Sequence, residues 1–109
     1  STLFPYTTLF RSFLVGKKKK YKKFNVKNLN TNIVNKKINH KVNGNTNTVY
    51  INPLNSLKFV LNKIKKDKIK LNNDFYVFTG STLGVAQIKS KGLHVGKIDK
   101  LGSVKVIIA

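Results

Sequence analysis

Few side chains in this sequence are able to do acid–base or metal chemistry. Asp67, Asp74 and Asp99 are the only carboxylate side chains, and His40 and His94 are the only imidazoles. There is no cysteine and no glutamate, so a disulfide framework and a thiolate metal site are both excluded. The two histidines lie far apart in the sequence and have no carboxylate at ligand spacing, so we expect no zinc site.

One short stretch rich in glycine and hydroxyl side chains, "TGSTLG" at 79–84, has the composition of a catalytic loop. It lacks the Gly-x-Ser-x-Gly spacing of a serine nucleophile elbow. The longer run "GSTLGVAQIKSKG" matches neither a phosphate-binding Walker loop nor a dinucleotide fingerprint. Residue chemistry by itself therefore defines no reaction.

The basic charge of the chain has two explanations. With 22 basic and 3 acidic side chains, the formal net charge is +19. Basic chains often bind nucleic acids by displacing counterions from phosphates, and "KKKKYKK" at Lys17–Lys23 suits that function. Lysine, asparagine and isoleucine are also the residues of A/T-rich codons, and here the lysines are spread along the whole chain. Because nucleic-acid surfaces usually use arginine, we favour the compositional explanation and do not expect nucleic acid as a partner.

The first twelve residues differ in composition from the rest. "STLFPYTTLFRS" holds the only arginine and has no lysine or asparagine. Thr2–Ser12 is similar to the translation of an adapter used in DNA-sequencing libraries, and the stretch lacks the basic start, apolar run and cleavage site of a signal peptide. We therefore interpret residues 1–12 as an artefact that contributes nothing to a core. Residues 13–109 are then expected to be a C-terminal fragment.

The clearest predicted element is an amphipathic helix over residues 53–66. Asn52 is a good N-cap, and Pro53 suits the first helical position, where its missing N–H costs nothing. Lysines in the last turns stabilise the helix, because the carboxyl end of the helix dipole attracts cations. One apolar stripe follows the helical period and consists of Leu54, Leu57, Leu61 and Ile64.

The other predicted elements are strands. Apolar runs predict them at Phe13–Gly16, Phe75–Gly80, Gly92–Asp99 and Leu101–Ala109, the last two joined near 100–102. Weak alternation on both sides of Asn43–Gly44 predicts a hairpin that turns there. We expect Leu57 and Leu61 of the helix to face a sheet made by Phe75–Thr79 and Val104–Ile108.

Several short motifs occur in an order and spacing that resemble one enzyme family. They are "FLVG" at 13–16, "VNGN" at 42–45, Asn52-Pro53 with its helix, Asn73-Asp74, Thr79-Gly80-Ser81 and "LGSV" at 101–104. In these the chain resembles the C-terminal end of the 2-keto-4-pentenoate hydratase / 4-oxalocrotonate decarboxylase family, of the fumarylacetoacetate hydrolase superfamily. It departs from the family at Ile51, which replaces glycine, at Ser90–Leu93, which replaces a Pro-Gly-Asp turn, and at Thr82-Leu83, whose order is exchanged.

The resemblance implies a metal-dependent lyase of aromatic catabolism. Members of the family bind Mg²⁺ or Mn²⁺ through carboxylates, and the metal holds a 2-oxo acid or 2-hydroxydienoic acid and stabilises an enolate. The family's glutamate ligands and lysine lie upstream of the "FLVG" strand, so the resemblance implies no catalytic and no metal-binding residue in this chain. It leaves one substrate-binding loop, Thr79, Gly80 and Ser81, whose hydroxyl and N–H groups would donate to a carboxylate.

These observations together predict an α+β chain: the β-rich C-terminal part of a fumarylacetoacetate-hydrolase-like mixed β-sheet roll with one amphipathic helix. We expect a truncated and inactive lyase of this type, cytoplasmic, homo-oligomeric in the parent enzyme, and without a membrane segment, because no apolar run reaches about 18 residues. Two alternatives stay open. They are a small basic module that binds nucleic acid or ribosomes, and a non-functional open reading frame.

Overall fold

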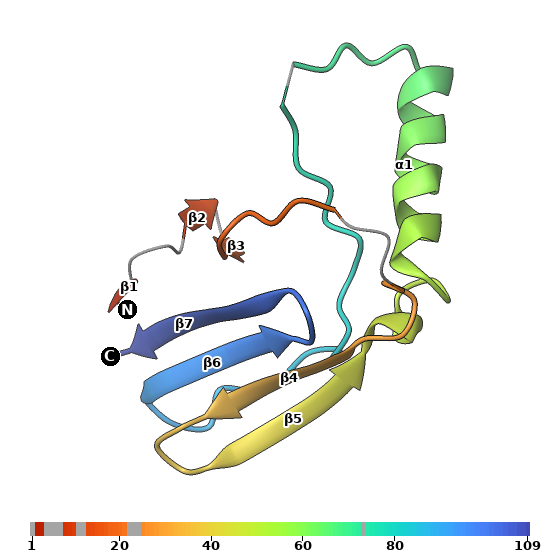
Figure 1. Ribbon diagram of the computed structural model, residues 1–109. Coiled ribbons are helices and arrows are strands. Elements are labelled where there is room, and N and C mark those ends of the chain that lie inside the picture. Colours follow the sequence, from red (N-terminus) through yellow and green to blue (C-terminus); the bar gives the residue numbers. More distant parts are fainter. Residues whose placement is uncertain (1, 4–7, 11–12, 22–24, 73) are drawn as a thin grey trace.

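The chain forms a strand-rich α+β structure with one α-helix (Figure 1). A computed structural model describes residues 2–3, 8–10, 13–21, 25–72 and 74–109. Its elements are β1 (Thr2–Leu3), β2 (Thr8–Phe10), β3 (Phe13–Val15), β4 (Asn30–Asn35), β5 (His40–Asn45), the 3₁₀-helix η1 (Thr46–Thr48), α1 (Pro53–Lys66), β6 (Gly92–Ile98) and β7 (Gly102–Ile108). The predicted α+β class and the helix are confirmed. The fumarylacetoacetate-hydrolase-like roll stays a prediction, and the main sheet of the described residues is antiparallel rather than mixed as expected.

The main sheet is antiparallel throughout and has the strand order β1-β7-β6-β4-β5. Its centre is the β6–β7 hairpin, in which Ile98 pairs with Gly102 across a tight turn. Lys100 in that turn has a φ of 66° and Gly102 a φ of 102°, and a left-handed φ of this kind favours glycine at position 102. The predicted strands at 92–99 and 101–109, and their connection, are confirmed.

The β4–β5 hairpin is confirmed, but the predicted position of its turn is wrong. The strands pair from Asn30 with Asn45 to Asn35 with His40, and the chain turns through residues 36–39. Asn39 has a φ of 50° there, a conformation that asparagine adopts more easily than most residues. The expected turn, Asn43–Gly44, instead lies inside β5, opposite β4.

Helix α1 begins and ends as its sequence predicts. The Asn52 side chain accepts a hydrogen bond from the Leu54 N–H at 3.1 Å, and Pro53 occupies the first turn. The expected packing of the helix is wrong, because α1 extends beyond the sheet (Figure 1) and none of its residues is buried. Leu61, expected in the core, is 42% exposed.

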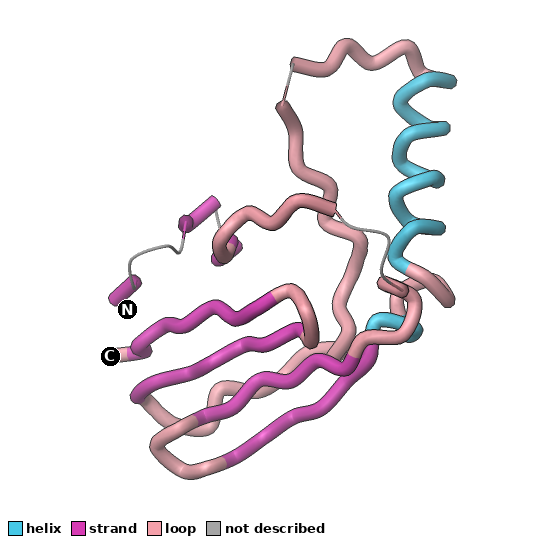
Figure 2. The backbone as a smooth tube through the Cα atoms, in the orientation of Figure 1, coloured by secondary structure: helices cyan, strands magenta, loops and turns pink. Residues whose placement is uncertain are grey.

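The apolar run at 75–80 is not a strand, which corrects a second expectation. Residues 74–80 have no strand assignment and lie in a long connection between α1 and β6 (Figure 2). Phe75, Tyr76 and Phe78 are each roughly half exposed. An apolar and aromatic composition favours a strand, but β-propensity depends on the tertiary context and does not decide by itself whether a strand forms. A sheet made by Phe75–Thr79 and Val104–Ile108 is therefore absent from the described structure.

The N-terminal residues pair only through short segments. β1 joins the edge of β7, and β2 pairs with β3 in a separate two-stranded ladder, which confirms the predicted strand at 13–16 in its first three residues. The side chains of residues 1–12 lie outside the described structure, so their expected lack of packing stays a prediction. Among the residues with described burial, the buried ones are few: Leu29, Thr31, Asn35, Thr46 and Val49.

No helix in the described part of the chain is long and apolar enough to cross a membrane. The 14 residues of α1, with lysines in the last turn, are too short and too polar for a span.

Candidate functional site

The two faces of the main sheet differ in chemistry. Residues directly opposite each other on neighbouring strands share a face. The registers place an apolar set on one face, called here the apolar face, which also carries Thr31, Asn35, His40 and His94; the set consists of Ile33, Val42, Gly96, Ile98, Val104 and Val106. The opposite face, called here the polar face, carries a polar set together with Val34, Leu93, Val95 and Ile107; the polar set consists of Asn32, Lys41, Asn43, Lys97, Ser103 and Lys105. Most of the polar set is exposed, as expected for a face in contact with water.

The apolar face is the floor of an open pocket of about 930 Å³. Three parts of the chain enclose it: the sheet, the segment from Leu14 to Lys19, and the connection before β6. Ile33, Ile98 and Val104 contribute the floor, and Tyr76, Phe78 and Leu83 contribute the wall formed by the connection. Phe78 is fixed from outside by Phe13 of β3, whose ring stacks on it with centroids 4.1 Å apart.

The loop at 81–84 is held against the sheet by its polar groups. The hydroxyls of Thr31 on β4 and Thr82 share a hydrogen bond of 2.7 Å. Within the loop, the Ser81 hydroxyl donates to the Gly84 carbonyl at 2.8 Å and accepts from the Leu83 N–H at 3.2 Å. The loop can lie this close only because Gly44 of β5 has no side chain, since a Cβ there would collide with the Thr82 carbonyl oxygen and lie 2.8 Å from the Leu83 side chain.

The predicted substrate-binding residues do not line the pocket themselves. Two residues that line it come directly after them in the sequence. Thr79, Gly80 and Ser81 do not line the pocket, whereas Thr82 and Leu83 do. Gly80 is close to Val49, whose side chain would be 3.2 Å from a Cβ at that position. The Ser81 hydroxyl already makes two hydrogen bonds inside its own turn. Substrate binding by Thr79, Gly80 and Ser81 stays a prediction, and sequence reasoning did not single out Thr82, which lines the cavity.

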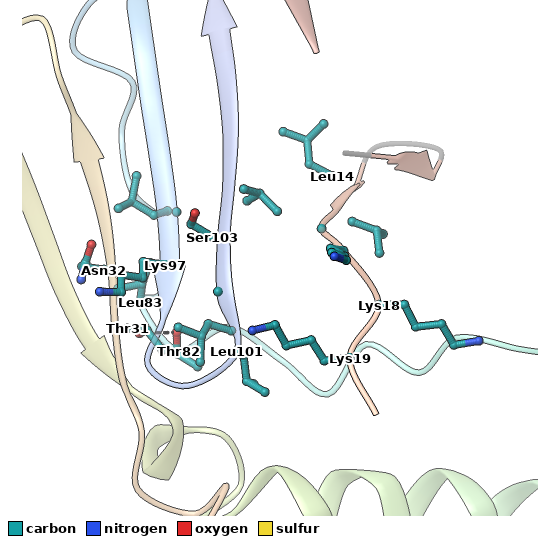
Figure 3. Close-up of a pocket in the computed structure, with 18 of the residues that line it drawn as sticks. Leu14, Lys18, Lys19, Thr31, Asn32, Thr82, Leu83, Lys97, Leu101 and Ser103 are labelled. Atoms are coloured by element: carbon teal, nitrogen blue, oxygen red, sulfur yellow. Dashed lines mark hydrogen bonds between the residues drawn. The ribbon is translucent and has the colours of Figure 1, made fainter. Parts of the chain in front are cut away.

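Lysines at positions 17, 18, 19 and 97 line the pocket. Lys19 extends from its segment toward the sheet, whereas Lys18 points away from it (Figure 3). The Lys19 ammonium lies at the β6–β7 turn, 3.8 Å from where a Cβ on Gly102 would be. The side chain of Lys97 lies with that of Asn32 on the polar face (Figure 3). We therefore infer that Lys97 lines the pocket with its backbone atoms. No carboxylate lines the cavity.

The acids and histidines are not gathered at this site. Asp67 pairs with Lys63 at 2.9 Å at the end of α1, where both side chains are well exposed. Asp74 lies in the connection and Asp99 in the β6–β7 turn. His94 has its Nδ1 2.9 Å from the Gly92 carbonyl, and its buried Nε2 has no hydrogen-bond partner among the described atoms.

These positions do not fit a divalent metal ion. Mg²⁺ needs carboxylate oxygens around one point, and no three His or Asp side chains of the described residues come together. The arrangement instead offers an apolar floor, a hydroxyl and an ammonium group. That combination suits a small organic anion, whose charge meets the lysine and whose carbon skeleton meets the sheet.

Comparison with known proteins returns nothing: no family model matches the chain, and no curated protein and no solved structure matches it. The function must therefore be argued from the motifs and from the pocket.

Proposed function

We propose that this chain belongs to a lyase of the 2-keto-4-pentenoate hydratase / 4-oxalocrotonate decarboxylase type, and that its pocket binds the 2-oxo acid substrate. The observation that carries the proposal is the position of the residues that follow Thr79-Gly80-Ser81. The motif resemblance assigns substrate binding to those three residues, and the next two, Thr82 and Leu83, form one wall of the pocket. Such an enzyme would act on small acids in the cytoplasm.

The pocket suits the charge of a 2-oxo acid. Lys19 would pair with the carboxylate, and the Thr82 hydroxyl would donate to the neighbouring carbonyl oxygen. Groups placed in this way stabilise negative charge that develops on the carbonyl oxygen when an enolate forms. The parent family uses Mg²⁺ or Mn²⁺ for the same purpose. Because the described residues do not fit that ion, we assign this chain substrate binding only and expect no turnover from it alone.

A titration of the chain with 2-oxopentanoate, followed by calorimetry, tests the proposal. Val104 lines the pocket, whereas the exposed Asn43 of β5 lies on the opposite face of the sheet and does not line it, so Val104→Trp fills the pocket and Asn43→Trp is its control. We expect saturable binding to the original chain, a loss of at least tenfold in affinity for Val104→Trp, and a change within twofold for Asn43→Trp. Absence of saturable binding, or equal losses in the two variants, would refute the proposal.

The polar face favours a second candidate function, binding of a nucleic-acid backbone. Lys41, Lys97 and Lys105 come from three strands of one face, and the strand residues of β4–β7 on that face include no acid and no aromatic ring. Such a surface attracts phosphates but offers no ring on which bases stack.

A salt titration with a short DNA duplex tests this second function. A phosphate-binding surface loses affinity linearly in log salt, and Lys→Gln substitution of Lys41, Lys97 and Lys105 would reduce that slope. The matched control replaces Lys58, Lys65 and Lys68 of the helical region, which removes the same charge. Equal effects of the two triple variants would show that net charge alone attracts the duplex.

A further inference from the structure

The size of the pocket exceeds what a five-carbon acid needs. Its volume is about 930 Å³, near the upper end of the roughly 300–1,000 Å³ of pockets that hold drug-sized ligands. A five-carbon 2-oxo acid has only a few non-hydrogen atoms and would leave most of that space to water. Water in contact with an apolar floor is unfavourable, so a ligand with more apolar surface would bind better.

The pocket has apolar lining from both the sheet and the connection before β6. Val104 and Ile33 lie on the floor, and the rings of Tyr76 and Phe78 line the same cavity from the connection. Phe78 is also stacked on Phe13 with an interplanar angle of 18°. An aromatic or branched tail would find both aliphatic and aromatic contacts here.

The lysines that line the pocket are those at positions 17, 18, 19 and 97. Of those labelled in Figure 3, Lys19 extends toward the sheet, Lys18 points away and Lys97 lies on the polar face. Lys19 has no ion-pair partner among the described residues. Its ammonium lies 3.8 Å from where a Cβ on Gly102 would be, so a carboxylate bound by Lys19 would lie at the β6–β7 turn.

From these observations we infer that the pocket selects a 2-oxo acid with one carboxylate and a bulky apolar tail, and that Lys19 is the residue that recognises the carboxylate. This inference rests on the proposed function and narrows its substrate class. The pocket should bind such an acid more tightly than a short acid, which makes fewer apolar contacts. It should also bind it more tightly than a dicarboxylic acid, whose second charge would lie against the apolar floor at a high desolvation cost.

Four probes test the inference by calorimetry with the full chain. Phenylpyruvate has the carboxylate and a bulky tail, pyruvate lacks the tail, 2-oxoglutarate has a second carboxylate, and phenylacetone lacks the carboxylate. Each buried methylene equivalent contributes about fourfold in affinity, so phenylpyruvate should bind at least tenfold more tightly than pyruvate or 2-oxoglutarate. It should also bind more tightly than phenylacetone.

Two neighbouring variants test the role of Lys19. Lys19→Gln should weaken phenylpyruvate binding on the order of tenfold and leave phenylacetone binding unchanged. Lys18→Gln removes the same charge one residue away and should change neither by more than twofold. Equal affinities for phenylpyruvate and pyruvate would refute the selection of a bulky apolar tail. Equal effects of the two substitutions would refute the role of Lys19 in binding the carboxylate. If Val104→Trp leaves the binding of every probe unchanged, the pocket itself is refuted and the proposed function fails with it.

Discussion

Replacing Gly44 with alanine should release the loop that forms one wall of the pocket. A Cβ at position 44 would collide with the Thr82 carbonyl oxygen, and it would lie 2.8 Å from the Leu83 side chain and 2.9 Å from the Thr82 carbonyl carbon. Two of these three atoms belong to the backbone, so no rotation of a side chain relieves the contact. Either β5 or the loop has to move.

The size of the effect follows from what that movement breaks. Overpacking of a close contact typically costs about 1–3 kcal/mol, which includes the loss of the 2.7 Å hydrogen bond between Thr31 and Thr82, worth about 1 kcal/mol. For a chain of this size, each kcal/mol lowers the melting temperature by about 4–8 °C. Urea denaturation followed by circular dichroism measures the loss, and affinity for phenylpyruvate should fall in parallel because Leu83 leaves the pocket.

A double-mutant cycle shows whether the loop is the cause. Thr82→Val should destabilise the original chain by about 1 kcal/mol but should cost little once Gly44→Ala has displaced the loop. Asn43→Ala, on the exposed opposite face, is the neighbouring control and should be nearly neutral. A neutral Gly44→Ala variant, or two substitutions whose costs simply add, would contradict the close packing of the loop on β5.

Three further predictions concern other parts of the chain. Leu61→Ala should lower the free energy of unfolding by less than about 1 kcal/mol, because Leu61 is 42% exposed and a buried leucine would cost about 2–5 kcal/mol; urea denaturation distinguishes the two. Deletion of Ser1–Ser12 should cost less than about 2 kcal/mol, the scale of one large buried apolar side chain, and a larger loss in thermal unfolding would show that the segment packs. Calorimetry with Mg²⁺ and Mn²⁺ should detect no micromolar site, because the three aspartates lie in separate parts of the chain. An absorbance assay with 2-hydroxypenta-2,4-dienoate should accordingly detect no turnover. Tight metal binding with turnover would show that carboxylates do come together at a metal site.

Local signals in the sequence predicted local structure well. The ends of α1 follow from an Asn52 cap and a proline in the first turn, and both act within a few residues of the helix start. The β6–β7 hairpin likewise joins neighbouring segments. The α+β class could also be predicted from local signals, because it depends on which helices and strands form. It depends less on how those elements pack against one another.

Contacts between distant segments were predicted poorly. Asn43–Gly44 has the composition of a hairpin turn, but its glycine is needed for the close approach of a loop almost forty positions later in the sequence. Phe75–Thr79 has the composition of a strand but has no partner strand in the described structure. The candidate site shows the same limit, because the hydrogen bond between Thr31 and Thr82 joins residues 51 positions apart. No pattern within a short window contains that information.

The long connection before β6 also decides how the chain would respond to cleavage. It presents half-exposed aromatic residues, Phe75, Tyr76 and Phe78, outside the strands of the described structure, and proteases that cut after aromatic residues act on exposed connections of this kind. A cut there would leave the β4–β5 hairpin with α1 on one piece and the β6–β7 hairpin on the other. The ladder between β4 and β6, from Thr31 paired with Ile98 to Asn35 paired with His94, would still join the pieces. The chain is thus built as two halves that a nick converts into a non-covalent complex, and separately expressed halves should reassemble along that ladder.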